Sequence, residues 1–380
     1  MEIVAVEAVP LRRDLDHRFA NAQKWIDSRE YCLVRIETDT GIEGWGECWG
    51  PIAGNRELLT DYVGPWLEGR DPRNVEQLHD DLLFTLTSSY HSYAPASVIS
   101  GVDIALWDVY GKALDTSVSR LLGGRRRDRV RAYATGHFWS ETDDFEALKA
   151  DVVEEATGHV DAGFDALKNK IGLYRHPDFP WGWREDVELV RAIREAVGDD
   201  VRLSTDANHA YDVATAKRVG QALADLDVYF FEEPVVPRAI DDYATLNRQL
   251  GTPLAGGECW AFEHEFERVL DAGGVGVIQP DITSAGGLTS TRRVVELANA
   301  KNVQCMPHVF GSAIALAASL QVIATIPGEP MLEFDRTPNP IRDDLAKQSV
   351  ENEGNAVPIP DRPGIGIEID QDVLDSFRVY

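Results

Sequence analysis

The sequence predicts an α/β protein in which a (β/α)8-type barrel follows an N-terminal α+β region. Three observations lead to this prediction. From Val130 onward, eight short apolar runs alternate with amphipathic helical windows. Seven consecutive runs, from the second onward, carry a titratable side chain at or near their ends. The residues before 126 instead combine strand-like runs, a hairpin signal and one long apolar helix.

The composition limits the function classes. The 380 residues are 44% hydrophobic, which supplies a sizeable core and excludes a disordered chain. The net charge of −27 repels phosphate backbones and anionic lipid heads, so we expect no nucleic-acid partner and no membrane partner. The four cysteines form no CxxC pair, and the N-terminus lacks a signal-peptide pattern. We therefore expect a cytoplasmic protein without a disulfide framework.

The charge balance also predicts a habitat. Acidic residues number 64 and basic residues 37, of which only eight are lysine. This balance is typical of proteins from salt-loving organisms, because at molar salt the Debye length falls to about 3 Å and self-repulsion nearly vanishes. We expect a halophilic protein; an acidic mesophilic enzyme is the alternative.

The N-terminal region, residues 1–125, is expected to form an α+β domain. Glu2–Leu11 alternates loosely and predicts a strand. Tyr31–Glu37 and Gly44–Cys48 are β-rich runs around Asp39-Thr40-Gly41, which predicts a hairpin. Ala96–Leu114 has apolar residues at helical spacing.

Residues 126–350 are expected to form the barrel. The predicted strands are Val130–Thr135, Ala166–Ile171, Val201–Thr205, Val228–Phe231, Pro253–Gly257, Gly276–Pro280, Val303–Pro307 and Met331–Phe334. Helices such as Val187–Val197 and Ala214–Ala224 lie between them, and the eighth helix is weak. The tail, residues 351–380, is rich in Pro and Gly and is expected to return to the N-terminal domain.

Titratable residues at the strand ends carry the functional prediction. They recur at intervals of 23 to 36 residues, about one βα unit each. The C-terminal strand ends of a barrel meet at one rim, where the active sites of barrel enzymes lie. The residues are Lys168, Lys170, Asp206, Glu232, Glu258, Asp281, His308 and Glu333.

Three of these residues predict a metal site. Asp206, Glu232 and Glu258 come from adjacent strands, and three close carboxylates repel one another unless a cation joins them. Oxygen ligands alone favour a hard ion, Mg²⁺ or alternatively Mn²⁺.

Two groups are candidate acid/base residues. Lys168 and Lys170 share one face of a strand, so each is expected to depress the other's pKa, and one can then act as a base. His308 is expected to receive support from Asp281 on the neighbouring strand. Glu333 could donate a hydrogen bond if it is held protonated.

Other polar residues carry weaker indications. Asn208 and His209 follow the third barrel strand and are candidates for substrate contact. His91 and His137 are expected to be loop or surface histidines.

These residues stand in motifs that resemble the mandelate racemase subgroup of the enolase superfamily over essentially the full length. The motifs are Lys168-Asn169-Lys170, Asp206-Ala207-Asn208, Phe231-Glu232-Glu233-Pro234, Gly257-Glu258, Gln279-Pro280-Asp281, Pro307-His308 and Leu332-Glu333-Phe334. The resemblance implies a modified TIM barrel, (β/α)7β, with an N-terminal α+β capping domain completed by the tail. It also implies one essential Mg²⁺ on Asp206, Glu232 and Glu258, and a homo-oligomer.

The resemblance also implies roles for the other residues. Lys170 and His308, the latter with Asp281, become opposed acid/base groups; Lys168 contacts the substrate carboxylate, and Glu333 stabilises an enolate. Further stretches, such as Glu333-Phe-Asp-Arg-Thr-Pro-Asn-Pro, resemble the galactarolactone cycloisomerases within the subgroup. The loops expected to choose the substrate are Phe19–Ile26 and Trp49–Asn55.

The expected function is removal of the α-proton of a sugar-acid carboxylate, followed by loss of a β-oxygen. An acid-sugar dehydratase, which expels water, is favoured. A cycloisomerase that opens a lactone and a racemase or epimerase are alternatives on the same residues, so the partner is a small sugar acid or lactone. A Schiff-base aldolase and a non-catalytic binding protein are more remote alternatives.

Overall fold

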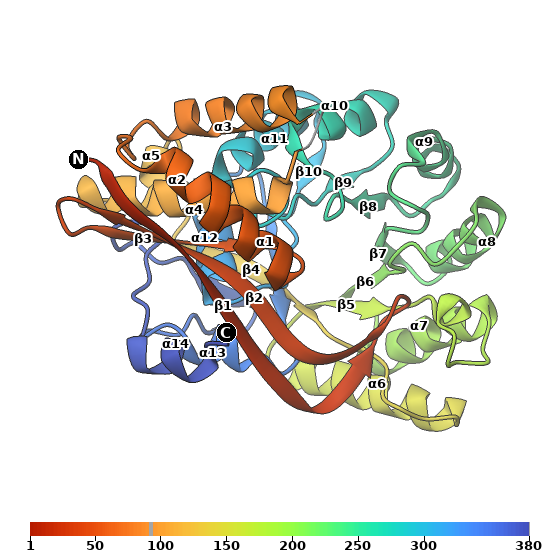
Figure 1. Cartoon of the computed structure of the whole chain (residues 1–380). Coiled ribbons are helices and arrows are strands. Elements are labelled where there is room, and N and C mark those ends of the chain that lie inside the picture. The colour runs from red at the N-terminus through yellow and green to blue at the C-terminus, as the bar shows by residue number, and fades with distance from the viewer. Residues whose placement is uncertain (91–93, 380) are drawn as a thin grey trace.

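The N-terminal part contains a three-stranded antiparallel sheet, described here from a computed structural model of residues 1–90 and 94–379, which leaves His91 outside (Figure 1). Its strands, in the order β1-β2-β3, are β1 (Ile3–Ala20), β2 (Trp25–Thr38) and β3 (Glu43–Cys48). The predicted Asp39-Thr40-Gly41 turn joins β2 to β3, and Gly41 has a φ of 78°. The prediction for the first strand was too short. Beyond Leu11 the strand is charged and mostly exposed, and its pairing with β2, not apolar alternation, carries it to Ala20.

Helices cover one face of this sheet. They are α1 (Ile52–Leu58), the π-helix η1 (Leu59–Val63), α2 (Gly64–Leu67) and α4 (Ala96–Ala113). Helices α3 (Val75–Ser89) and α5 (Val118–Leu121) pack on α4 instead. Helix α4 confirms the predicted long helix and packs closely on β3. A Cβ at Gly46 would lie 1.8 Å from the carbonyl oxygen of Gly101, so only glycine on β3 permits this approach.

Each of the eight predicted barrel runs contains a strand, and these strands form one curled parallel sheet. The strands are β4 (Arg129–Thr135), β5 (Ala166–Lys170), β6 (Arg202–Asp206), β7 (Val228–Glu232), β8 (Leu254–Gly256), β9 (Val277–Ile278), β10 (Gln304–Cys305) and β11 (Met331–Asp335). They are ordered β10-β9-β8-β7-β6-β5-β4-β11. Among the described residues, the outermost strands β10 and β11 are not paired with each other.

Seven long helices follow the first seven strands and surround the sheet. They are α6 (Phe145–Asp161), α7 (Trp183–Val197), α8 (Val213–Ala224), α9 (Ile240–Gln249), α10 (Phe262–Ala272), α11 (Gly287–Ala300) and α12 (Ala313–Ile323), with the 3-10 turn η2 (Leu173–Arg175) before α7. The eighth strand is followed directly by the short α13 (Pro340–Asp344). The sheet is therefore of the (β/α)7β type, as expected.

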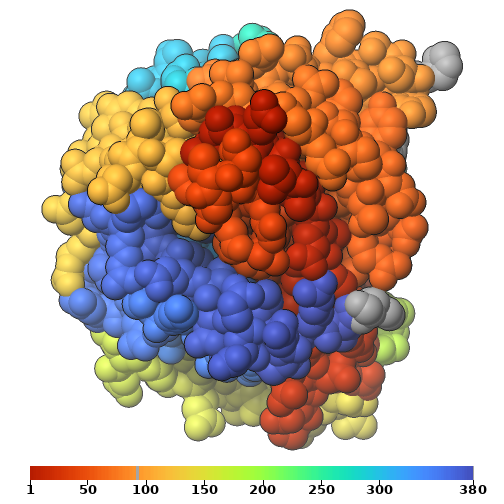
Figure 2. All heavy atoms as spheres, turned by 60° about the vertical axis from the view of Figure 1, so that its left-hand side comes forward, coloured from red at the N-terminus to blue at the C-terminus, as the bar shows by residue number. Residues whose placement is uncertain are grey.

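The chain after residue 350 contacts both parts of the molecule. Strand β12 (Ala356–Pro358) pairs antiparallel with β4 in the barrel. Farther along, Gly364 accepts a hydrogen bond from Val118 N at 2.9 Å, and Arg378 after helix α14 (Gln371–Phe377) forms an ion pair with Glu7 on β1. Figure 2 shows these C-terminal residues in blue beside the N-terminal residues in red.

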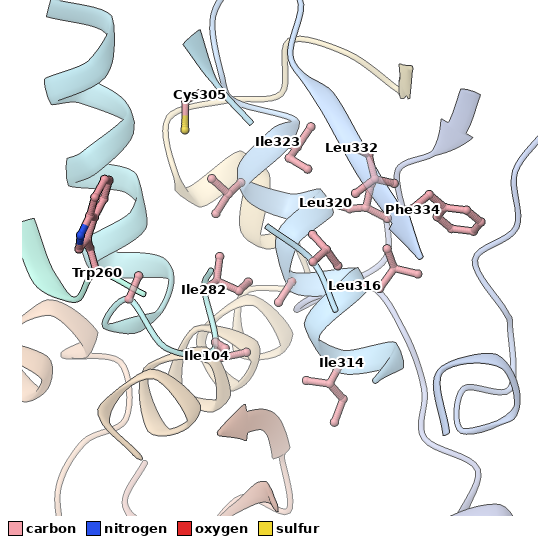
Figure 3. Packing of buried hydrophobic residues seen from close by; sticks show 14 of the residues in the cluster. Ile104, Trp260, Ile282, Cys305, Ile314, Leu316, Leu320, Ile323, Leu332 and Phe334 are labelled. Atoms are coloured by element: carbon pink, nitrogen blue, oxygen red, sulfur yellow. The ribbon is translucent and has the colours of Figure 1, made fainter. Parts of the chain in front are cut away.

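One hydrophobic core runs through both parts. Ile104 of α4 belongs to the same buried cluster as Leu320 of α12 and Phe334 of β11 (Figure 3). The two parts are therefore held together by apolar burial as well as by polar contacts. None of the described helices combines the length and the apolar character that a membrane span requires.

A buried carboxylate also joins the parts. Glu47 on β3 is fully buried and accepts hydrogen bonds from the N-terminus of α12, from Ser312 N at 3.1 Å and Ala315 N at 3.3 Å. The Ser312 hydroxyl donates a further bond. Burial raises the pKa of Glu47 to about 7, although the bonds from Ser312 oppose the shift.

Candidate active site

The predicted carboxylate trio lies at one end of the barrel. Asp206 and Glu232 are register partners at the ends of β6 and β7, and Glu258 follows β8 by two residues. Asp206 and Glu232 are buried, whereas 18% of the Glu258 side chain is exposed. One oxygen from each carboxylate lies within 4.8 Å of the others. An all-oxygen set of this kind fits a hard divalent cation.

Both predicted lysines are buried beside these carboxylates. Lys168 Nζ lies 2.8 Å from Glu232 Oε1 and 2.7 Å from Glu333 Oε1, and Lys170 Nζ bonds to Asp206. Lys168 does lower the pKa of Lys170, as expected, but the predicted net depression, which would leave one lysine neutral, was wrong. Burial does oppose the charged form, but the surrounding carboxylates outweigh it and raise the pKa of both lysines, that of Lys168 most strongly.

His308 and Asp281 face one another across neighbouring strand ends. His308 Nδ1 lies 2.6 Å from Asp281 Oδ2, and its other nitrogen, Nε2, lies 3.2 Å from Glu258 Oε2. Burial lowers the pKa of His308, but Glu258, Glu333 and Asp281 together raise it to about 10. Nδ1 therefore donates to Asp281, and Nε2 is the nitrogen that faces the trio.

Glu333 does not have the protonation state that the sequence suggested. It accepts a hydrogen bond from the Thr135 hydroxyl at 2.8 Å and forms the ion pair with Lys168. Burial raises its pKa, but Lys168 and His308 outweigh burial and lower it. Glu333 is therefore a carboxylate here and not the protonated donor that the sequence suggested.

The two candidate substrate residues lie beside the trio. Asn208 is buried, its N–H donates to Asp206 Oδ1 at 2.9 Å, and its carbonyl accepts from Gln23 Nε2 at 3.4 Å. His209 Nε2 lies 3.1 Å from Glu233, a buried carboxylate whose pKa burial raises strongly. His209, Glu233, Glu258 and the Cys259 thiol form a second group able to hold a metal, but it shares Glu258 with the trio.

Aromatic residues from the N-terminal part reach the acid/base groups. Trp49 lies edge-on to His308, with ring centroids 6.0 Å apart. Phe19 packs on Phe138 at 4.8 Å, and the Phe138 ring lies 5.0 Å from Lys170 Nζ. Both segments expected to choose the substrate therefore lie at the barrel rim.

Sequence reasoning missed several residues that hold the site. Tyr133 and Thr135 on β4 bond to Glu333, and Gln279 Nε2 donates to Glu232 Oε2 at 2.8 Å. The two-residue spacing of Tyr133 and Thr135 places them on one strand face and could have indicated them. His137 lies in a loop, as predicted, but it is not a surface residue, because it is only 1% exposed.

Two family models match the chain. The enolase C-terminal domain-like model matches residues 151–373. The N-terminal domain model of mandelate racemase / muconate lactonizing enzyme matches residues 5–123.

Curated relatives match over nearly the whole length. The chain is 40% identical to D-galactarolactone cycloisomerase of Agrobacterium fabrum, covering 100% of this chain and 99% of the relative. It is 33% identical to arabinonate dehydratase of Saccharolobus solfataricus, covering 92% and 91% of the two chains.

Solved structures agree in fold. The 3,6-anhydro-D-galactonate cycloisomerase of Zobellia galactanivorans is 34% identical over 100% of both chains, with a TM-score of 0.88. A racemase of Streptomyces coelicolor A3(2), solved with bound magnesium, is 29% identical, covers 99% of this chain and 100% of its own, and has a TM-score of 0.87.

Proposed function

The chain belongs to the mandelate racemase / muconate lactonizing enzyme group of the enolase superfamily and is an enzyme, and from that premise we propose that it abstracts the α-proton of a sugar-acid carboxylate and then expels the β-oxygen. One observation carries the proposal. Lys170 and His308 each contact a different member of the carboxylate trio, Asp206 and Glu258. A substrate carboxylate held at the trio would lie between two groups able to move protons.

We assign the metal to the trio. Asp206, Glu232 and Glu258 would hold Mg²⁺, or Mn²⁺, because their donor atoms are all oxygens and lie close together. When bound, the ion supplies Lewis-acid stabilisation to the charge that develops on the substrate carboxylate. Lys168 places a buried positive charge between Glu232 and Glu333, where it supports the same charge.

Lys170 and His308 would divide the proton transfers. One removes the α-proton, and the other donates a proton to the departing β-oxygen. Asp206 and Glu258 help to raise the pKa values of these two groups. Once those carboxylates serve as metal ligands, they raise the two pKa values less. The unprotonated form of Lys170 or His308, which can act as a base, is then favoured near neutral pH. Asp281 orients His308 so that Nε2 faces the substrate.

The leaving group in our proposal is a ring oxygen, which makes the enzyme a cycloisomerase. The support is the 40% identity to a lactone cycloisomerase over the full length, together with the cycloisomerase structure that matches over 100% of both chains. An acid-sugar dehydratase, which expels water, is the second candidate because dehydratases match at 32–33% identity.

A substrate screen in D₂O tests the proposal. The enzyme with Mg²⁺ is incubated with mono- and diacid sugars and their lactones, and products are followed by NMR and mass spectrometry. We expect one lactone or cyclic sugar acid to open without a change in composition, whereas loss of one water would identify a dehydratase. Deuterium at the α-carbon without elimination would indicate a racemase, and no exchange with any compound would refute the proposal.

Matched variants locate the chemistry. Lys170→Met and His308→Asn should each lower turnover at least about a hundredfold, the usual contribution of a positioned acid or base. Lys217→Met and His264→Asn, which change exposed residues of the same types, serve as controls. Mg²⁺ binding should persist in the two site variants. Substantial activity in either would remove that residue from the catalytic pair.

A further inference from the structure

A third cluster of metal-ligating side chains lies away from the two groups at the barrel rim. Glu155 and His159 stand four residues apart on α6, and His137 lies in the loop between β4 and α6. Residues four apart share one face of a helix. One ligand atom from each of the three side chains lies within 4.8 Å of the others. His159 Nε2 is 3.3 Å from Glu155 Oε1, and the two imidazole rings are 5.2 Å apart and nearly perpendicular.

The orientation of His137 distinguishes this cluster from an ordinary polar network. Its Nδ1 lies 3.2 Å from the carbonyl oxygen of Lys168. A carbonyl oxygen only accepts, so Nδ1 is the nitrogen that carries the proton. Burial lowers the pKa of His137, which keeps the ring neutral. Nε2 then has a free lone pair, and this buried atom has no hydrogen-bond partner among the described residues.

We propose that His137, Glu155 and His159 form a second divalent-cation site, of the two-histidine, one-carboxylate type that suits Zn²⁺. Two imidazole nitrogens and one carboxylate oxygen are typical ligands of Zn²⁺ and related transition-metal ions, whereas Mg²⁺ prefers oxygen alone. Histidines that bind metals generally donate their other ring N–H to a carbonyl or carboxylate, as His137 does to Lys168.

The cluster is accessible enough for a metal ion to bind from solvent. One third of the Glu155 side chain and 13% of the His159 side chain are exposed, so an ion can enter from solvent and keep a water ligand. Zinc–ligand distances of about 2.0–2.2 Å place ligand atoms roughly 3.5 Å apart. His159 Nε2 and Glu155 Oε1, 3.3 Å apart, already have about that separation.

The site would fasten a loop that reaches the active site. Phe138, next to His137, lies over Lys170 and packs against Phe310 at 5.9 Å. A cation bound to His137 and to two residues of α6 would fix this loop to the helix. The role is structural, and binding itself does not depend on the proposed reaction.

Zinc retention tests the inference. The protein is saturated with Mg²⁺, equilibrated with Zn²⁺ and desalted, and zinc per chain is measured by inductively coupled plasma mass spectrometry. We expect about one equivalent in the wild type and at least tenfold weaker binding in His159→Gln. Zn²⁺ should also raise the melting temperature of the wild type but not of His159→Gln.

Three control variants separate this site from its neighbours. His264→Gln changes an exposed histidine, and Cys259→Ser and Glu232→Gln alter the two groups near the barrel rim. All three should retain the zinc. The proposal is overturned if the wild type retains no zinc, or if His159→Gln retains as much as the wild type. Because His159 is partly exposed, His159→Gln should fold even if changes at the buried His137 do not.

Discussion

Glu47 should make the stability of the protein depend on pH in a predictable direction. Its pKa is about 7 in the folded chain, against an ordinary value of 4.5, and burial is the main cause. A raised carboxyl pKa means that the folded state binds the proton more tightly than the unfolded state. The ionisation of Glu47 therefore does not affect the free energy of unfolding below pH 4.5, and it lowers that free energy as the pH rises toward 7.

The magnitude follows from the two pKa values. One pKa unit corresponds to about 1.4 kcal/mol, so the full effect is about 3 kcal/mol. About 2 kcal/mol of it develops between pH 5.5 and pH 8. Glu47→Gln removes this titration. The free energy of unfolding of the wild type, relative to that of the variant, should therefore fall by about 2 kcal/mol between pH 5.5 and pH 8. With an unfolding entropy of about 2.1 cal/mol/K per residue, that is roughly 2–3 °C in melting temperature.

Thermal denaturation followed by circular dichroism at pH 5.5 and pH 8 measures this difference. Glu68→Gln, which changes an exposed glutamate, is the matched control. The difference between its melting temperature and that of the wild type should not depend on pH. A gap for Glu47→Gln that stays constant would refute the reasoning. A gap that widens in favour of the wild type at high pH would mean that the α12 N-terminus holds Glu47 ionised.

Further predictions concern the charges. Lys168→Met leaves Glu232 and Glu333 buried without their shared cation, so the metal-free protein should lose about 3–5 kcal/mol of stability in denaturant titrations, while Lys217→Met should leave it unchanged. EDTA should abolish turnover and Mg²⁺ restore it, as followed by product NMR; activity that survives complete chelation would remove the metal from the mechanism. The net charge of −27 should make the melting temperature rise with KCl as the Debye length shortens from about 30 Å at 0.01 M to 3 Å at 1 M. Equal melting temperatures in dilute and molar KCl would contradict the halophilic prediction.

The barrel was predictable because its signals are local. Each strand is a short apolar run, and a titratable residue at or near its end, such as Asp206 or Glu232, faces the rim whatever the helices do. The charged half of β1 was not predictable, because its strand conformation comes from pairing with β2 and not from its own pattern.

The charge states of the site were not predictable either. Sequence spacing places Lys168 and Lys170 on one strand face, but it does not show how many carboxylates surround each ammonium group. The ion pairs of Lys168 with Glu232 and Glu333 join residues 64 and 165 positions apart. Such long-range electrostatics decide the protonation states, and only the folded arrangement reveals them.

The pairing of β4 with both β11 and the tail has a consequence for synthesis. Strand β4 leaves the ribosome about 200 residues before β11, its neighbour in the sheet. At a synthesis rate of 5–20 residues per second, one edge of β4 stays unpaired for roughly 10–40 s. During this time the nascent chain carries an open strand edge, the kind of surface that recruits other chains. The abundant carboxylates repel one another between neighbouring nascent chains. This repulsion would help to keep the chains apart until the last residues emerge.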